Sequence, residues 1–216
     1  MTRSLLDQEL DKLKERLLHL ESMIQTAIER SIQALKEQNS ELAQQIIADD
    51  EEINKLRYKI EKLSMTIIAT QQPMASDLRT IIAAMHAAVE MERMGDHAAG
   101  IAHLVTEMCN EPLLKPLIDI PRMAQIAQEM LHDCIQAFMN KDEEVAKQIA
   151  ERDDAIDQLY GQVLRELLTY MMEDPRNIRR ATYLLWVAHG LERIGDRVTN
   201  IAERILFMET GQFKEL

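Results

Sequence analysis

The sequence has few of the residues on which disulfide-rich and all-β proteins depend. It contains 2 cysteines, Cys109 and Cys134, and their spacing gives neither a disulfide framework nor a zinc–thiolate site. Glycine (6 residues), proline (5 residues) and aromatic residues (4%) are also scarce. An all-β sandwich or barrel needs many turn and aromatic residues. The sequence therefore excludes these classes and disfavours alternating βα folds.

Positive charge and long apolar runs are lacking as well. The 25 basic and 37 acidic residues give a net charge of −12. Nucleic acids and anionic lipids both require a cationic protein face, so we predict no nucleic-acid partner and only peripheral membrane contact, through protein partners. The chain has no stretch of about 18 uncharged apolar residues that could span a bilayer. Its first residues alternate charge with leucine, unlike a signal peptide. These features predict a cytoplasmic protein.

What the chain does have is a set of helix-forming residues in helical periodicity. Leu, Ala, Ile, Met, Glu and Gln dominate the sequence, and apolar residues recur at three- and four-residue steps. Helices are expected to end near the prolines at 73, 112, 116, 121 and 175. We predict an all-α protein with six long antiparallel helices, at about 2–38, 40–70, 76–108, 122–140, 142–172 and 177–208.

The two halves of the chain are related in sequence. Residues 41–56 align with 144–159 at an offset of 103, and residues 78–102 align with 178–202 at an offset of 100. Such self-similarity predicts a tandem repeat of one structural unit. We therefore expect two three-helix bundles, at 1–109 and 122–216, joined by a proline-rich linker at 110–121.

The first half contains acidic residues whose spacing places them on facing helices. Glu92 and Asp96 are four residues apart and share one helix face. Asn54 precedes Pro73 by 19 residues and Glu92 follows it by 19; Asp50 precedes it by 23 and Asp96 follows it by 23. If the chain folds back at this proline, the four side chains reach the same height along the two helices.

The second half repeats this arrangement. Asp157 and Asp153 precede Pro175 by 18 and 22 residues, and Glu192 and Asp196 follow it by 17 and 21. Carboxylates held close together repel one another unless they are protonated or bind a cation. Oxygen ligands of this kind favour a hard divalent cation, with Mg, Mn or Fe as candidates. The alternative is an exposed acidic patch that binds no metal.

The candidate metal ligands share an oxygen-bearing side chain at one of these two heights. They are Asp50, Asn54, Glu92, Asp96, Asp153, Asp157, Glu192 and Asp196. The first set has Asn54 where the second has Asp157, so the first is expected to bind metal more weakly.

Other residues near the acids have simpler expected roles. Gly95 and Gly195 recur between the acids of each pair, and serve either close helix approach or access to the site. Arg193 is expected to form ion pairs, His97 to lie at the surface, and Trp186 to lie in the core or at its rim.

Five segments of the chain resemble the PhoU family of bacterial phosphate-transport regulators. They are ADDEEINKL (48–56), QQPMASDLR (71–79), MERMGDHAAGIA (91–102), ERDDAIDQL (151–159) and LERIGDRVTNIAE (191–203). The resemblance implies two three-helix bundles with multinuclear metal clusters at the acidic motifs, in a cytoplasmic protein that is often a homodimer. It also implies a non-catalytic adaptor between a phosphate ABC transporter and a sensor histidine kinase, which keeps the phosphate-starvation response off when phosphate is plentiful.

Three alternatives remain open at this stage. Within the family, the chain could instead control a low-affinity phosphate carrier. A carboxylate-bridged di-iron oxidase is a second alternative, but such bundles use two Glu-x-x-His pairs, and we find one, Glu129 and His132. The third is a purely architectural helical module, in which the acids have no role in metal binding or signalling.

Overall fold

The computed structural model describes the backbone of residues 2–212 and the side chains of residues 5–149 and 151–212. The described chain is all-α, as predicted. It forms six long helices and one short 3₁₀ turn: α1 (Thr2–Glu37), α2 (Ser40–Gln71), α3 (Ser76–Met108), α4 (Asp119–Asn140), α5 (Glu143–Glu173), η1 (Pro175–Asn177) and α6 (Ile178–Thr210).

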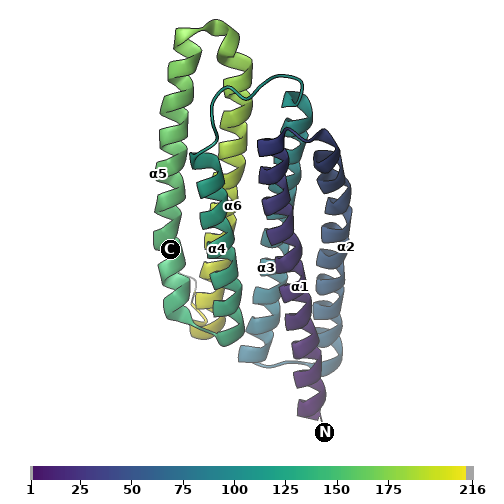
Figure 1. Cartoon of the computed structure of the whole chain (residues 1–216). Helices are drawn as coiled ribbons and strands as arrows, with labels where there is room; N and C mark the ends of the chain where they lie inside the picture. The colour runs from purple at the N-terminus through teal and green to yellow at the C-terminus, as the bar shows by residue number, and fades with distance from the viewer. Residues whose placement is uncertain (1, 213–216) are drawn as a thin grey trace.

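The helices form two three-helix bundles that lie side by side (Figure 1). Helices α1, α2 and α3 make the first bundle and α4, α5 and α6 the second, with α3 packed along α6. The two packed helices run antiparallel: Arg79 Nε, near the start of α3, donates to the carbonyl of Met208, near the end of α6, at 2.8 Å. As a result, the α2–α3 turn and the α5–α6 turn lie at opposite ends of the molecule (Figure 1).

Small side chains allow α3 and α6 to occupy the centre of the molecule. Each packs against three other helices, and close approach on several sides requires little side-chain bulk. Their fully buried alanines are Ala83, Ala84, Ala87, Ala88, Ala98 and Ala102 in α3, and Ala181, Ala188 and Ala202 in α6. Larger residues from the surrounding helices, such as Leu17 and Leu20 of α1, fill the space between the helices.

The first turn of each repeat is built in the same way. Gln38 and Lys141 both adopt left-handed backbone conformations, with φ of 51° and 57°. The next residue caps the following helix: Asn39 accepts from the Leu42 amide at 3.0 Å, and Asp142 accepts from the Val145 amide at 3.1 Å. Asn and Asp at an N-cap satisfy amides that have no partner within the helix. The offset of 103 residues thus relates equivalent turns.

A pseudo-two-fold axis passes between α1 and α4. Gln25 Nε2 donates to the carbonyl of Gln128 at 2.8 Å, and Gln128 Nε2 donates to the carbonyl of Gln25 at 3.1 Å. These two glutamines are separated by the same 103 residues. Each therefore makes the contact that its counterpart makes, as expected for equivalent residues on either side of a two-fold axis.

The repeat also preserves an ion pair while exchanging its charges. In the first bundle Arg30 Nη1 lies 2.5 Å from Asp49 Oδ2. At the equivalent positions in the second bundle, Arg152 Nη1 lies 2.5 Å from Asp133 Oδ2. The geometry of the contact between the first two helices of each bundle is retained, although the acid and the base have changed helices.

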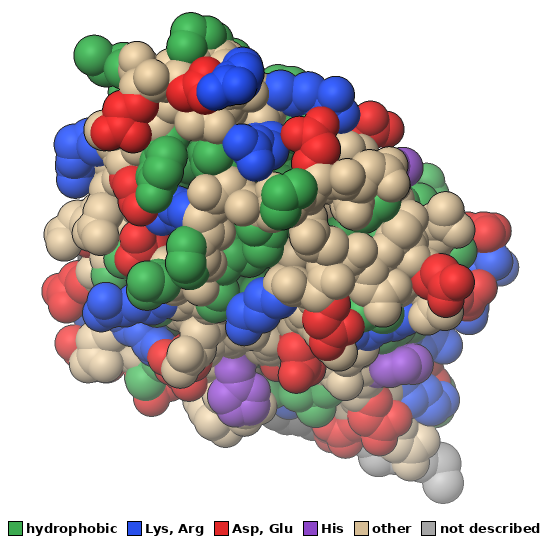
Figure 2. All heavy atoms as spheres, turned by 45° about the horizontal axis from the view of Figure 1, so that its top comes forward, with side chains coloured by type: hydrophobic (Ala, Val, Ile, Leu, Met, Phe, Trp, Pro, Cys, Tyr) green, Lys and Arg blue, Asp and Glu red, His purple; other side chains and the backbone are tan. Residues whose placement is uncertain are grey.

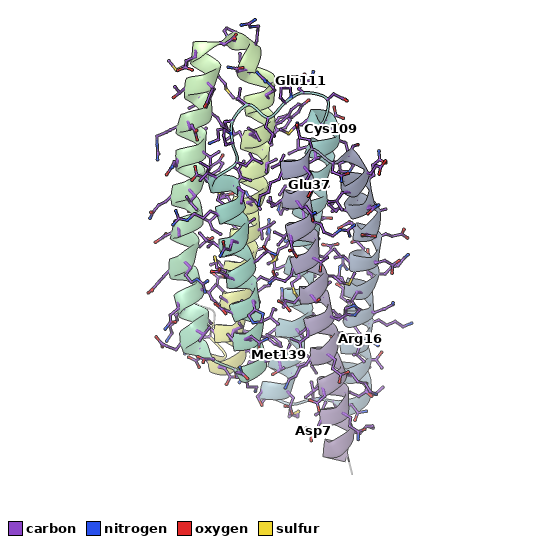
Figure 3. The ribbon with its side chains drawn as sticks, in the orientation of Figure 1. Asp7, Arg16, Glu37, Cys109, Glu111 and Met139 are labelled. Atoms are coloured by element: carbon purple, nitrogen blue, oxygen red, sulfur yellow. The ribbon has the colours of Figure 1, made fainter. Side chains whose placement is uncertain are left out.

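The predicted start of the fourth helix is wrong by three residues, since α4 begins at Asp119 rather than at about 122. Pro121 therefore lies in its first turn, where proline is tolerated because the first amides have no partner within the helix. The segment before α4 is held by side chains: Lys115 is buried and pairs with Glu166, and Gln38 Nε2 donates to the Glu111 carbonyl at 2.5 Å. Figure 3 shows Glu37, Cys109 and Glu111 at this same end of the molecule.

Exposed apolar side chains are prominent at the end formed by the α5–α6 turn. Met172 is 85% exposed, and Leu168 and Ile178 are also exposed. Figure 2 shows hydrophobic side chains gathered on part of this end, with Lys and Arg side chains between them. Trp186 of α6 is 53% exposed, so the prediction that it lies in the core or at its rim is wrong.

Glycine substitutions test the close contact between α5 and α6. A Cβ at Gly195 would be in steric conflict with Asp153 Oδ1 and would lie 3.0 Å from Ile156 Cδ1. Alanine would gain about 1 kcal/mol of helix propensity, but overpacking typically costs about 1–3 kcal/mol. We expect Gly195→Ala to leave the free energy of unfolding unchanged or lower it by up to about 2 kcal/mol, as measured by urea denaturation.

Gly100 provides the matched control. It lies in α3 and is exposed, and a Cβ added there would meet no heavy atom within 4 Å other than its own helix backbone and chain neighbours. Gly100→Ala should therefore stabilise the protein by about 1 kcal/mol. If Gly195→Ala stabilised the protein as much as Gly100→Ala does, this result would contradict the close packing of Gly195 against α5.

Candidate metal-binding faces

The first acidic face consists of Asp50, Asn54, Glu92 and Asp96, on the facing sides of α2 and α3. The two helices pack together after folding back at the turn that contains Pro73. Asp50 is half-buried, and the negative charges of Asp96 and Glu92 repel its carboxylate and raise its pKa. Asn54 Nδ2 donates to Asp50 Oδ2 at 3.0 Å. The amide thus occupies one oxygen of the carboxylate that could otherwise bind a cation.

The second acidic face consists of Asp153, Asp157, Glu192 and Asp196, on the facing sides of α5 and α6. Asp153 feels the charges of the other three carboxylates. It also accepts a hydrogen bond at 3.4 Å from the Thr199 hydroxyl. This face carries four carboxylates, where the first carries three and an amide. The structure thus brings each set of four predicted residues to one pair of packed helices.

Burial and mutual repulsion raise the pKa values of acids on both faces. Burial, followed by repulsion from Asp157 and Asp196, raises the pKa of Asp153 to about 6. Burial is also the main cause of the raised pKa values of Asp50, Asp157 and Glu192, and in each case a neighbouring carboxylate adds to it. Negative charge on these faces is therefore incompletely neutralised by the protein itself.

Three buried carboxylate oxygens on these faces have no hydrogen-bond partner. They are Oδ1 of Asp50, Oδ1 of Asp153 and Oε2 of Glu192, the last of which lies within ion-pair distance of His189 Nδ1 (3.4 Å) and Arg193 Nε (3.5 Å). A buried acceptor without a donor carries a desolvation cost, and carboxylate oxygens are the ligands that hard divalent cations prefer. The chemistry of the donor set therefore fits a divalent ion.

The acidic side chains are not arranged around a common point at which a metal ion could be coordinated. Within the described part of the chain, no group of three or more His, Cys, Asp or Glu side chains is arranged so that it could hold a metal ion. Arginines occupy part of each face instead. Arg57 Nη2 lies 3.5 Å from Glu92 Oε1, and Arg193 Nη1 lies 2.8 Å from Asp196 Oδ2. Binding a metal would require these acids to turn away from their arginines.

The sequence reasoning missed Arg57 and identified Arg193 only as an ion-pairing residue. Arg57 also pairs with Glu61, at 2.7 Å on the same helix, and this spacing of four residues is visible in the sequence. Its reach across to Glu92 depends on how α2 packs against α3. His97, expected at the surface, is half-buried, and its pKa is lowered mainly by burial.

The single Glu-x-x-His pair lies away from both acidic faces, in the groove between α1 and α4. There Glu129 pairs with Arg152 at 3.3 Å, and His132 Nδ1 lies 3.5 Å from Glu21 Oε1. Glu129 and His132 thus each contact a polar side chain of another helix in this groove. The structure therefore gives no support to a di-iron centre that combines this pair with the predicted acids.

The chain matches known proteins along most of its length. The family model described as the PhoU domain matches residues 17–105 and again residues 120–205. A phosphate-specific transport system accessory protein PhoU homolog from Aquifex aeolicus is 41% identical over 205 residues, which cover 95% of this chain and 93% of that protein. The homolog of the same name from Zymomonas mobilis is 38% identical over 206 residues, covering 95% of this chain and 87% of its own.

Solved structures share the complete fold. The crystal structure of PhoU from Pseudomonas aeruginosa superposes with a TM-score of 0.90 at 33% identity, covering 95% of this chain and 99% of that one. The phosphate transport system regulatory protein PhoU from Streptococcus pneumoniae superposes with a TM-score of 0.91 at 32% identity, covering 98% and 100%. With two matches to the family model, one in each three-helix repeat, and near-full-length relatives at this level of identity, the chain belongs to the PhoU family.

Proposed function

We propose that this chain is an accessory protein of phosphate transport that acts without catalysis. The observation that carries this proposal is the 41% identity, over nearly the whole of both chains, to a phosphate-specific transport system accessory protein. In this role it restrains phosphate uptake and phosphate-starvation signalling by linking a phosphate ABC transporter to a sensor histidine kinase, as a homodimer. Control of a low-affinity phosphate carrier is the runner-up within the same family.

An adaptor must present surfaces to protein partners, and this chain exposes apolar side chains that suit such contacts. Met172 and Ile178 are exposed at the α5–α6 end, and Met65 and Met74 are exposed towards the α2–α3 turn. Contiguous exposed apolar surface commonly marks an interaction site, whereas single exposed apolar side chains do not. Among the described residues, no helix is long and apolar enough to cross a membrane. We propose that contact with a membrane is peripheral and made through protein partners.

We further propose that the second acidic face binds a divalent cation, with Mg, Mn and Fe as the candidates. A bound cation would supply positive charge that neutralises the carboxylates and ties α5 to α6. The residues that would hold it are Asp153, Asp157, Glu192 and Asp196. Asp153 and Glu192 contribute the oxygens that lack hydrogen-bond donors, while Asp196 would have to exchange Arg193 for the ion.

The first acidic face should bind the same cation more weakly. Asn54 brings no negative charge, and its amide already donates to Asp50 Oδ2 at 3.0 Å. Ion affinity in carboxylate sites depends strongly on the number of charged ligands. We expect the two faces to differ in affinity despite their equivalent positions in the repeat.

The regulatory role predicts a loss of phosphate control when the second face is altered. In a bacterium that lacks its own PhoU-family protein, the wild-type chain should restore repression of a phosphate-starvation reporter in phosphate-rich medium. The double variant Glu192→Ala with Asp196→Ala should fail to restore it, because α6 loses both of its carboxylates on this face. Reporter activity in phosphate-rich and phosphate-poor medium measures the effect.

A second double variant controls for the loss of negative charge. Glu151 and Glu173 are exposed acids on α5, and replacing both by alanine should leave repression intact. Normal repression by the Glu192/Asp196 variant, together with an unchanged metal content, would favour a purely architectural module. Failure of the wild-type chain to repress at all would contradict the regulatory proposal itself.

The raised pKa of Asp153 predicts a pH dependence for cation binding. A metal ion binds the ionised carboxylate, which in the metal-free protein is protonated below a pH of about 6. We expect the affinity for Mn²⁺, measured by isothermal titration calorimetry, to fall by up to about tenfold per pH unit below pH 6 and to level off above it. Asp153→Asn should bind more weakly and lose this step.

The same shift acts on folding with the opposite sign. The folded state holds the Asp153 proton more tightly than the unfolded state does. The raised pKa of Asp153 therefore contributes fully to the free energy of unfolding below the ordinary aspartate pKa of 3.8, and this contribution is lost as the pH rises to about 6. Asp153→Asn should therefore stabilise the metal-free protein at pH 7 more than at pH 4.

For the cation-binding prediction, an affinity for Mn²⁺ that is unchanged between pH 5 and pH 7 would contradict the assignment of Asp153 as a ligand.

A further inference from the structure

We propose that a cavity between α1 and α2 binds a small organic cation, a primary alkylammonium with an apolar body. The cavity has a volume of about 330 Å³, within the size range of small-molecule sites. It lies in the first repeat, and residue Gly95 of α3 also lines it. This inference does not depend on the proposed regulatory function.

Apolar side chains from two helices form most of the walls of the cavity. Met23 and Ala27 of α1 line it, together with Ile46 and Ile53 of α2. Both isoleucines belong to the buried core, so these walls are held by packing on their other sides. Such a surface favours the aliphatic or aromatic part of a ligand.

The second repeat has its own cavity of about 340 Å³, lined in part by Asp133, Ile149 and Arg152, the counterparts of Arg30, Ile46 and Asp49, but that cavity does not reach the position equivalent to Ala27. At an offset of 103 residues, Ala27 corresponds to Met130, which is completely buried in the second bundle. The larger methionine supplies volume at a position where Ala27 leaves it free. Gly95, which has its own counterpart in Gly195, also lines the cavity, and the side chains of Ile24 and Ile53 pack close against it, since a Cβ there would lie 3.2 Å from each.

The charged residues around the cavity favour a cationic ligand. Three carboxylates line it, those of Asp49, Asp50 and Glu52. The single guanidinium, that of Arg30, is already engaged: its Nη1 donates to Asp49 at 2.5 Å, and its Nη2 donates to Gln45 at 3.2 Å. Two of its five N–H donors are used in these bonds, and its positive charge is paired with Asp49.

Asp50 provides the acceptor that an ammonium group would use. Its Oδ2 accepts from Asn54, but its Oδ1 is buried and lacks a hydrogen-bond partner. An ammonium carries three donors, and a charge-assisted bond to a buried carboxylate is stronger than a neutral one. By the same reasoning the cavity should reject inorganic phosphate and carboxylic acids, which would bring further negative charge beside Asp50; the other two carboxylates are paired, Asp49 with Arg30 and Glu52 with Lys55.

The test uses n-hexylammonium as the probe and the full-length protein with ¹³C-labelled methionine and isoleucine methyl groups. Binding should shift the NMR signals of Met23, Ile46 and Ile53. Hexanoate and inorganic phosphate should leave these signals in place, and the neutral 1-hexanol should bind more weakly than hexylammonium. Dissociation constants follow from the concentration dependence of the shifts.

Two variants identify the cavity and its anchoring group. Ala27→Met introduces the residue of the second repeat and should weaken hexylammonium binding at least about tenfold by filling the space. Asp50→Asn should weaken hexylammonium binding by removing the negative charge, without reducing the volume of the cavity. Glu173→Gln, which removes an exposed carboxylate of α5 far from this cavity in sequence, should leave binding unchanged, and methyl spectra will show that each variant is folded.

Several results would overturn the proposal. They are the absence of any shift up to about 10 mM hexylammonium, unchanged binding to a folded Ala27→Met variant, and equal binding of hexanoate. Unchanged binding to Asp50→Asn would overturn the assignment of the ammonium to this carboxylate. None of these outcomes alters the phosphate-dependent repression test, so the two proposals fail independently.

Discussion

The antiparallel packing of α3 against α6 is the contact on which the arrangement of the whole molecule depends. Each of these helices is rich in buried alanine and packs against three neighbours. A three-helix bundle on its own would leave the interbundle side of α3 or α6 in water, at a cost proportional to its apolar area. Joining the two bundles buries that side. It also fixes their opposite orientation, with the reciprocal bonds of Gln25 and Gln128 at the pseudo-two-fold axis.

The packing of α5 against α6 creates the electrostatic problem of the second acidic face. Helices that approach closely enough to bury Gly195 against Asp153 also bring Asp157, Glu192 and Asp196 within reach of that carboxylate. The chain offsets part of this repulsion with Arg193. Asp153 Oδ1 and Glu192 Oε2 still lack a hydrogen bond, although Arg193 Nε lies 3.5 Å from the glutamate oxygen. A buried acceptor without a hydrogen bond lowers stability, and a bound cation would offset that cost.

The sequence was sufficient to predict the helices and the heights of the acids, because both follow from local periodicity. Helix α3 spans Ser76–Met108 as predicted, and the register about Pro73 and Pro175 places each set of acids on packed helices. The start of α4 was missed because Pro121 was treated as a helix breaker, whereas it lies in the first turn. Arg57 reaches Glu92 from another helix, and the repeat alone does not specify how two bundles face each other. Such contacts depend on packing between distant segments.

Differences between the repeats are informative because the scaffold around them is the same. The exchange of charges between Arg30–Asp49 and Asp133–Arg152 preserves an ion pair at equal distance, so it is a neutral change in structure. The change from Asp157 to Asn54 is different, since it removes a negative charge from a crowded face and places an amide on Asp50. The change from Met130 to Ala27 removes side-chain volume beside that same carboxylate. Both differences that alter chemistry therefore converge on Asp50, while the second repeat retains its full set of acids and a buried methionine at position 130. A duplicated scaffold permits the two proposed roles to be divided, because one copy can keep four carboxylates while the other changes the residues around one of them.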